Sequence, residues 1–389
     1  MYRPDRRRFL KTSTLGASAA LIAGQSFATV AFRQQTASSP DRKIIKRKLG
    51  RTGLELPVVS MGVMRADNPA LPRAALEAGM VHLDTAHGYQ KGKNEQMLGE
   101  VLKAYPRESF VIATKIPPEG KESFLAKLDL SLERLQMKYA DILYLHGISS
   151  RDGILDKEML EALKAAKDSG KARHIGVSTH KNEPEVIRAV VESGVLEVVL
   201  TSVNFKQDHY EEMRKAIAEA ANAGIGIVAM KTMAGAFLDK EKTKPINCRA
   251  ALKWVLQDEN VTTAIPGITS FDQLTDNASV NYDIALNEKE KQDLAEGKSE
   301  SGLYCQGCDE CTRSCTRNLP IPDIMRAYMY TYGYRDAAQA RILLAGLGLR
   351  GNPCESCADC PIQCPKGFPV NEKIADVTRL VGVPEEFLA

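Results

Sequence analysis

The sequence predicts an α/β protein, in which a barrel of alternating strands and helices precedes a small, mostly α-helical, cysteine-rich domain. Eight short apolar runs between residues 44 and 287 alternate with amphipathic stretches, which matches a (β/α)8 barrel in number and length. Eight of the nine cysteines lie between Cys305 and Cys364, so the end of the chain differs chemically from the rest. We therefore expect the barrel over residues 43–297 and the second domain over residues 298–389.

Residues 1–31 predict a signal peptide for export. Arg6, Arg7 and Arg8 precede a weakly apolar stretch rich in Gly and Ala, followed by small residues typical of a cleavage site. The order RRxFLK resembles the twin-arginine signal, which implies export by the twin-arginine machinery to a periplasmic or other extracytoplasmic space. A basic disordered tail and a retained membrane anchor are the alternatives, although the apolar stretch is short for a membrane span. Residues 32–42 predict a polar linker.

The overall composition excludes several classes of function. Hydrophobic residues make up 44% and charged residues 26% of the 389 residues, as in globular proteins. No apolar run reaches the roughly 20 residues of a membrane-spanning helix, so we expect no stable membrane insertion. The net charge is +3, and it becomes −1 without residues 1–31, which hold five basic side chains and one acidic one. A balance so close to neutral predicts no nucleic-acid partner.

The barrel prediction depends on eight strand candidates and on the helical segments between them. The strand candidates are residues 58–62, 82–85, 110–116, 141–147, 174–178, 197–203, 224–230 and 262–267. Several helical segments end at a glycine typical of a helix C-terminus, for example Gly170 and Gly224. An open doubly wound sheet fits the same alternation, but no GxGxxG motif follows the first strand, which counts against its dinucleotide-binding form.

Ionisable side chains gather at the ends of three successive strand candidates. Asp84 closes the second candidate, and Tyr89 lies in the loop after it. Lys115 closes the third candidate and His146 the fourth. A single Lys or His at a strand end is more often structural, but the carboxyl ends of barrel strands form the face on which active sites lie. Four such groups at one edge therefore predict a catalytic site.

Five segments resemble the aldo/keto reductases across about 250 residues, namely HLDTAHGYQKGKNEQMLG, VIATKI, DILYLHGI, HIGVSTH and AIPGITSFDQLTDN. The resemblance implies a TIM barrel that transfers hydride between a nicotinamide cofactor and a small carbonyl or alcohol substrate. It places the family's catalytic residues on Asp84, Tyr89, Lys115 and His146. Tyr89 would donate the proton, with a pKa lowered by Lys115. Asp84 would hold Lys115, and His146 would orient the carbonyl.

The resemblance also implies a set of cofactor contacts, with some departures from the family's pattern. These contacts are Ser178, Thr179, Asn204, Met230, Lys231, Gly267, Gln273, Asp276 and Asn277. Thr179 stands where the family usually has Asn. Gly267 and Gln273 stand where members that bind a 2′-phosphate often have Lys and Arg. Family habit favours NADP(H) as the cofactor, with NAD(H) as the close alternative.

Two cysteine runs of identical spacing predict two 4Fe-4S clusters. The first run is Cys305, Cys308, Cys311 and Cys315, and after 38 residues the pattern repeats at Cys354, Cys357, Cys360 and Cys364. The spacing resembles bacterial ferredoxins, in which the fourth cysteine of each run binds the other cluster. That resemblance implies that Cys364 joins the first three cysteines and Cys315 joins the second three, in a domain similar to the α-helical ferredoxins. Structural zinc and disulfides are the alternatives.

The combination leads to three hypotheses about function. In the first, the barrel is an oxidoreductase and the clusters pass electrons to or from a partner protein. In the second, the chain is an exported electron-transfer protein whose barrel is only a docking scaffold. In the third, the barrel is an enzyme and the clusters are purely structural. The substrate's identity lies in the shape of loops at the barrel's edge, which one sequence does not specify.

Overall fold

A closed barrel of parallel strands forms the centre of the fold in the computed structural model, which describes residues 43–238, 243–299, 303–357 and 360–388. Its strands are β3 (Met61–Gly62), β4 (His82–Asp84), β5 (Val111–Ile116), β6 (Ala140–Leu145), β7 (Ala172–Thr179), β8 (Val198–Ser202), β9 (Gly226–Met230) and β10 (Val261–Ala264). Neighbours in this order pair in parallel within the described residues. Bridges from Val59 to Ala264 and from Gly62 to Gly267 join the first strand region to the last and close the barrel. The TIM-barrel prediction is confirmed, and the open-sheet alternative is excluded.

The strand positions agree with the sequence except at their ends. Each of the eight strand candidates overlaps one strand of the barrel, but residues 58–62 form a strand only at Met61 and Gly62. The predicted signal peptide (1–31) and linker (32–42) lie outside the described residues. No helix among the residues that the structure describes is long and apolar enough to cross a membrane.

An antiparallel hairpin, β1 (Lys46–Lys48) and β2 (Glu55–Pro57), precedes the barrel and was not predicted. Leu49 and Leu56 from this hairpin are fully buried in one cluster with the residues that fill the barrel, such as Ile142, Tyr144 and Val228. Burying two leucines in this way stabilises the fold by roughly 1.5–3 kcal/mol each. The hairpin therefore completes the barrel's interior from the end opposite to the catalytic strand ends.

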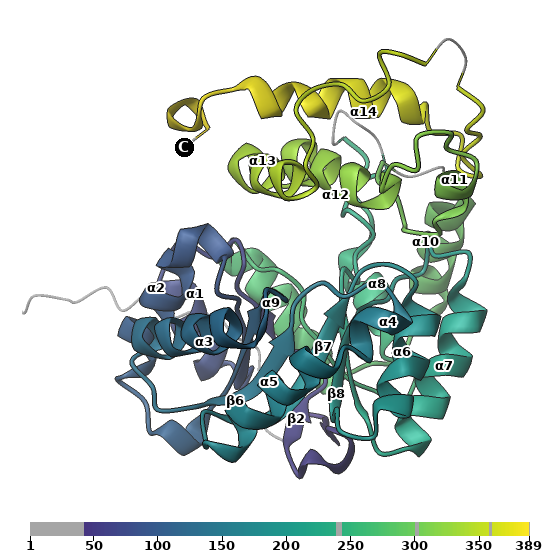
Figure 1. The fold of residues 1–389 in the computed structure, drawn as a ribbon. Coiled ribbons are helices and arrows are strands. Elements are labelled where there is room, and N and C mark those ends of the chain that lie inside the picture. The colour runs from purple at the N-terminus through teal and green to yellow at the C-terminus, as the bar shows by residue number, and fades with distance from the viewer. Residues whose placement is uncertain (1–42, 239–242, 300–302, 358–359, 389) are drawn as a thin grey trace, which may run out of the picture. The chain divides into compact units, whose positions relative to one another are not determined.

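Helices surround the strands and bury one apolar face each (Figure 1). They are α1 (Ala70–Glu77), α2 (Lys93–Leu102), α3 (Lys121–Leu135), α4 (Arg151–Ile154), α5 (Lys157–Asp168), α6 (Glu183–Ser193), α7 (Tyr210–Asn222), α8 (Cys248–Val255), α9 (Phe271–Ser279) and α10 (Glu288–Ser299). Short 3₁₀ helices are η1 (Gly50–Thr52), η2 (Tyr89–Gly92), η3 (Arg107–Ser109) and η4 (Val280–Tyr282). Helices α5 and α7 end just before Gly170 (φ 74°) and Gly224 (φ 79°), whose left-handed conformation confirms the predicted helix ends.

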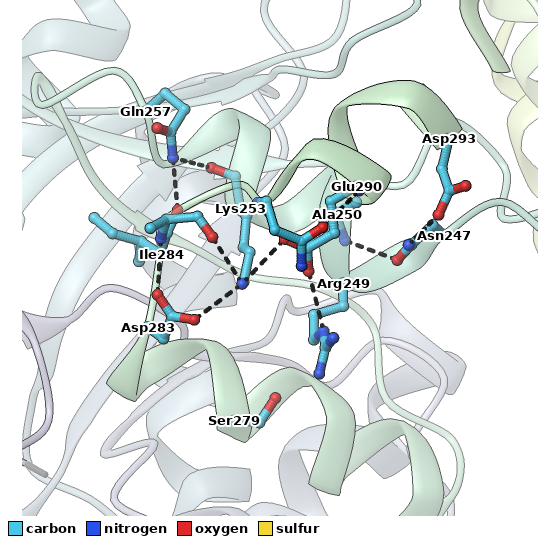
Figure 2. A network of polar contacts seen from close by, with 12 residues as sticks. Asn247, Arg249, Ala250, Lys253, Gln257, Ser279, Asp283, Ile284, Glu290 and Asp293 are labelled. Atoms are coloured by element: carbon cyan, nitrogen blue, oxygen red, sulfur yellow. Dashed lines mark hydrogen bonds and ion pairs between the residues drawn. The ribbon is translucent and has the colours of Figure 1, made fainter. Parts of the chain in front are cut away.

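A network of polar contacts fixes helix α10 against helix α8 (Figure 2). The Lys253 ammonium lies 3.3 Å from Glu290 Oε2 and 3.2 Å from Asp283 Oδ2, and it donates to Ala285 O at 2.8 Å. Asn247 donates to Asp293 at 2.8 Å. Helix α10 leads from the barrel toward the cysteine-rich segment, and the predicted boundary between residues 297 and 298 falls in its last turn.

The C-terminal segment is helical, as predicted for the residues between the cysteine runs. Its helices are α11 (Glu310–Arg313), α12 (Ile321–Tyr332), α13 (Ala337–Gly346) and α14 (Val370–Thr378), followed by η5 (Arg379–Gly382) and η6 (Glu385–Phe387). Helix α12 packs against both α13 and α14, and Ile324, Leu344 and Ile374 are fully buried between them. This segment has its own apolar core, and it belongs to the same compact unit as the barrel.

Candidate active site

Three of the four predicted catalytic residues form one buried polar group. Asp84 ends β4 and Lys115 lies on β5, and these parallel strands place both side chains at the same edge of the barrel. The Lys115 ammonium forms an ion pair with Asp84 and donates to the carbonyl oxygen of Thr85 at 2.6 Å. It lies 3.4 Å from the phenol oxygen of Tyr89. The ion pair is almost completely shielded from solvent, which holds Lys115 in place beneath the phenol.

His146 completes the predicted group. It follows β6 directly, and its imidazole ring meets the ring of Tyr89 edge-on, with centroids 6.1 Å apart and planes at 80°. Burial first, and then the charges of Lys115 and Arg326, lower the pKa of His146 to about 3. The imidazole is therefore neutral at physiological pH, and a neutral imidazole can donate a hydrogen bond to a carbonyl oxygen.

The pKa of Tyr89 does not follow the prediction. Burial raises this pKa well above its usual value, and Asp84 and Tyr330 raise it further. Burial also raises the pKa of Asp84 and lowers that of Lys115, while the ion pair between them opposes both shifts. The expectation that Lys115 lowers the pKa of Tyr89 is wrong for this structure, because desolvation outweighs the neighbouring charge. Tyr89 is thus a protonated phenol, the form that a proton donor needs.

A cavity of about 620 Å³ opens beside this group. Asp84, Tyr89 and His146 line it. Most of the predicted cofactor contacts line it too, namely Asn204, Met230, Lys231, Gly267, Gln273, Asp276 and Asn277. Ser178 and Thr179 are not on its wall. Instead, the Ser178 hydroxyl accepts a bond from Gly147 N at 2.9 Å, and the Thr179 hydroxyl donates to Lys181 O at 2.9 Å.

The loop after β9 wraps around the cavity in a strained conformation. Lys231, Ala234 and Ala236 all have positive φ angles (55°, 46° and 65°), which residues other than glycine rarely adopt. Burial, and then the like charge of Arg326, lower the pKa of Lys231 to about 7. The loop thus places an easily deprotonated amine on the cavity wall.

His180 also lines the cavity, although the sequence did not single it out. Its Nδ1 atom is buried and has no hydrogen-bond partner among the described residues. Burial, and then Lys231, lower its pKa well below the usual value, so the ring is neutral. The only available signal was its position at the end of HIGVSTH, directly after β7. A neutral imidazole with a buried, unpaired nitrogen is a ready hydrogen-bond partner for a ligand.

The cysteine-rich segment supplies the remaining wall of the cavity. Asp323, Arg326 and Tyr330 of α12 line it, and so does Cys305. Polar contacts join this segment to the barrel. Lys181 lies 3.4 Å from Asp309, Lys366 lies 2.7 Å from Asp208, and the Arg65 guanidinium lies 5.3 Å from the centre of the Tyr334 ring. The predicted catalytic residues therefore share a cavity with side chains from both parts of the chain.

The cysteines form two groups, each of which combines the two runs. Burial raises the pKa of Cys311 to about 12, and the nearby thiols of Cys305, Cys308 and Cys364 add to this shift. Burial likewise raises the pKa of Cys354, together with the thiols of Cys357, Cys360 and Cys315. These four also line a second cavity of about 250 Å³. Within the described ranges, no group of three or more His, Cys, Asp or Glu side chains is arranged to hold a metal ion.

Known proteins similar to this chain share the barrel. The family model described as "Aldo/keto reductase family" matches residues 62–250. The L-galactose dehydrogenase of Arabidopsis thaliana is 26% identical over 299 residues, covering 65% of this chain and 93% of that protein. The holo aldo-keto reductase of Bacillus halodurans superposes with a TM-score of 0.55 at 24% identity, covering 66% of this chain and 96% of that one.

An aldo-keto reductase of Klebsiella pneumoniae, solved in complex with NADPH, superposes with a TM-score of 0.54 at 22% identity, covering 66% of this chain and 95% of that one. Structural likeness at this identity shows the fold, while the matched family model covers the segments that hold Asp84, Tyr89, Lys115 and His146. The chain is therefore an enzyme, an oxidoreductase whose barrel is similar to the aldo/keto reductases.

Proposed function

We propose that this enzyme transfers hydride between NADP(H) and a small carbonyl or alcohol substrate. The observation that supports this most strongly is the buried Asp84–Lys115 pair beneath the Tyr89 phenol, beside the neutral imidazole of His146. A proton donor and a carbonyl-orienting group then lie on the wall of a cavity large enough for ligands. Packing alone does not explain four ionisable groups brought together in this way.

The chain's own residues account for the acid–base part of the reaction. A bound nicotinamide supplies the hydride. Tyr89 donates its phenol proton to the carbonyl oxygen, and the Lys115 ammonium 3.4 Å away stabilises the phenolate that remains. His146 donates a hydrogen bond to the same carbonyl oxygen and orients it. Burial of the group excludes water, which strengthens each of these interactions.

The cavity wall fits a nicotinamide cofactor in several respects. Asn204, Met230 and Lys231 line it at and after the ends of β8 and β9, and Asp276 and Asn277 line it from α9. The Klebsiella neighbour was solved with NADPH, which supports the same cofactor here. Gln273, however, uses its side-chain oxygen to bind Thr269, at 2.8 Å from the backbone nitrogen, and position 267 has no side chain beyond hydrogen. NAD(H) is therefore the competing cofactor.

A fluorescence titration with NADPH and NADH tests the cofactor, and steady-state reduction of a panel of aldehydes tests the reaction. We expect saturable binding of at least one nucleotide and turnover that requires it. A purified, folded protein that binds neither nucleotide would overturn the proposal and would favour the scaffold hypothesis.

We further propose that the cysteines bind two 4Fe-4S clusters. The grouping of Cys364 with the first run and of Cys315 with the second supports the exchanged ligand sets of two-cluster ferredoxins. Thiolates around a cubane cluster stand farther apart than the ligands of a single ion, because four iron and four sulfide atoms lie between them. The clusters would exchange single electrons with a partner protein.

An anaerobic titration with NADPH separates the electron-transfer and structural roles of the clusters. If the clusters accept electrons from the barrel, their visible absorbance bleaches in proportion to added NADPH. Absorbance that NADPH leaves unchanged and dithionite bleaches would support purely structural clusters. Protein isolated anaerobically without iron or sulfide would contradict the cluster proposal itself.

The location of the enzyme is also a proposal, supported by the sequence of residues 1–31 alone. We propose twin-arginine export, since that route carries folded proteins with their cofactors. Replacing Arg6 and Arg7 together by Lys should leave the protein in the cytoplasmic fraction. Equal extracytoplasmic amounts of the variant and the natural protein would contradict this route.

A further inference from the structure

Helix α12 presents two side chains to the catalytic group. Arg326 and Tyr330 are four residues apart, and residues at this spacing lie on the same face of a helix. Both line the cavity. The charge of Arg326 lowers the pKa values of His146 and His180. Tyr330 raises the pKa values of Tyr89 and Lys115. This face of α12 therefore lines the same cavity as Tyr89 and His146.

The cavity wall has more basic than acidic side chains. Five basic side chains line it, namely Arg65, Lys181, Lys231, Arg326 and Arg335, against three acidic ones. One of the acids, Asp84, is already paired with Lys115, which lies behind the wall. Among the basic groups, Lys181 is paired with Asp309 and Arg326 with Asp323. The charge of Arg326 still disfavours protonation of Lys231, and a bound anion would relieve that repulsion.

Arg326 is the basic side chain best placed for an anion at the reacting end of the cavity. In the described part of the chain it has one ion pair, from Nη2 to Asp323 Oδ1 at 2.9 Å. A guanidinium has five N–H donors in a planar fork, so this contact leaves donors for a carboxylate or phosphate. The acid–base chemistry derived above uses Tyr89, Lys115 and His146 and gives Arg326 no part.

We propose that Arg326 binds an anionic group of the substrate, so that the enzyme acts on carbonyl compounds bearing a carboxylate or phosphate near the reacting carbonyl, or on the matching hydroxy acids or phosphates. The inference rests on the proposed hydride-transfer function and adds the substrate class to it. It also gives the cysteine-rich segment a direct role in specificity, because Arg326 comes from that segment.

A pair of aldehydes of nearly equal shape tests this inference. Para-carboxybenzaldehyde carries an anion where para-nitrobenzaldehyde carries a neutral group. We expect the natural enzyme to have the higher kcat/KM with the carboxylate. In Arg326→Gln the ratio of the two kcat/KM values should fall by about 10- to 100-fold, mainly through KM, since the variant lacks the charged fork. Arg326→Lys should retain part of the preference. The same comparison of glyceraldehyde phosphate with glyceraldehyde shows whether phosphate is the better anion.

Two control variants distinguish binding of the substrate's anion by Arg326 from a purely structural role of this arginine. Arg350→Gln removes an exposed arginine of the same segment, away from the cavity wall, and should leave the ratio unchanged. Asp323→Asn breaks the ion pair of Arg326 but keeps the guanidinium, so the preference for the anion should persist or grow. An equal loss of preference in Asp323→Asn and Arg326→Gln would show that the pair only holds helix α12, which overturns the inference.

Three further outcomes would contradict either the anion site or the hydride-transfer function. A natural enzyme that reduces both aldehydes equally well would overturn the anion site and leave the hydride-transfer function standing. If Arg326→Gln weakens NADPH binding in a fluorescence titration without changing the ratio, the arginine serves the cofactor, and the inference is wrong. Reduction of neither aldehyde, nor of any other carbonyl compound, with either nucleotide would contradict the proposed function itself.

Discussion

The phenol oxygen of Tyr89 lies 3.4 Å from the ammonium nitrogen of Lys115, and the far side of that ammonium is held by Asp84. Because the phenol is the one proton donor in this group with an acidic O–H, we expect Tyr89→Phe to lower kcat by about 10²- to 10⁴-fold. The dissociation constant of the nucleotide should change little, since the phenyl ring remains. Stopped-flow reduction and a fluorescence titration measure the two quantities. Tyr282→Phe, at an exposed tyrosine, is the matched control, and equal rates in the two variants would remove Tyr89 from the mechanism.

The network between α8 and α10 (Figure 2) predicts that replacing a buried lysine destabilises the protein more than replacing an exposed one. Lys253→Met leaves the buried carboxylate of Glu290 with only the half-exposed Arg249 as an ion-pair partner, so the free energy of unfolding should fall by about 2 kcal/mol. Lys291→Met removes an exposed pair with Glu288 on the same helix and should cost less than about 1 kcal/mol. Urea denaturation of both variants measures the difference. Similar losses would mean that burial does not set the strength of these pairs.

His82 predicts how acid destabilises the barrel. Its ring is fully buried, neither nitrogen has a partner among the described residues, and burial followed by Lys115 lowers its pKa to about 3. The unfolded chain takes up a proton near pH 6.5 while the folded one does not, so stability falls as the pH falls from 6.5 toward 3. This group contributes a loss of about 1.4 kcal/mol per pH unit in that window.

His82→Leu should remove this contribution. Urea denaturation at a series of pH values should give a shallower decline below pH 6.5 than in the natural protein, and no difference in slope above it. Parallel curves for the two proteins across the whole range would show that His82 does not titrate as its burial implies.

The exchanged grouping of the cysteines predicts which substitutions disturb the same cluster. Cys364→Ser should change the same electron paramagnetic resonance signal as Cys311→Ser, since both thiols lie in the first group. Cys315→Ser should instead resemble Cys357→Ser. Cys248→Ser, at the cysteine outside both runs, should leave the iron content unchanged. Signals that sort by run, with Cys315 resembling Cys311 and Cys364 resembling Cys357, would contradict the exchange.

The elements that local sequence determines were predicted well. Strand and helix alternation follows from apolar periodicity, and the helix ends at Gly170 and Gly224 follow from the left-handed conformation that glycine tolerates. Asp84, Lys115 and His146 were predictable because the ends of neighbouring parallel strands must meet at one edge. Each of these inferences needs only short-range rules and the closure of the barrel.

The features that depend on distant segments were not predicted. Arg326 and Tyr330 have no local signal, because they reach the cavity from the C-terminal segment, whose place beside the barrel no short-range rule gives. The rise in the pKa of Tyr89 depends on burial, which a sequence does not state. Ser178 and Thr179 matched a family position, yet their hydroxyls bond to neighbouring backbone instead of lining the cavity.

The two cysteine runs flank the helical hairpin of α12 and α13, since Cys315 precedes it and Cys354 follows it. Any centre that binds thiols from both runs would cross-link the two ends of that hairpin and close the chain between them into a loop. The position of Arg326, on α12 between the two runs, would then depend on whether metal is bound at the cysteines. Loss of iron would loosen the substrate pocket even if no electron ever passed through the clusters, so oxidative damage to the cysteines and loss of substrate selectivity would occur together.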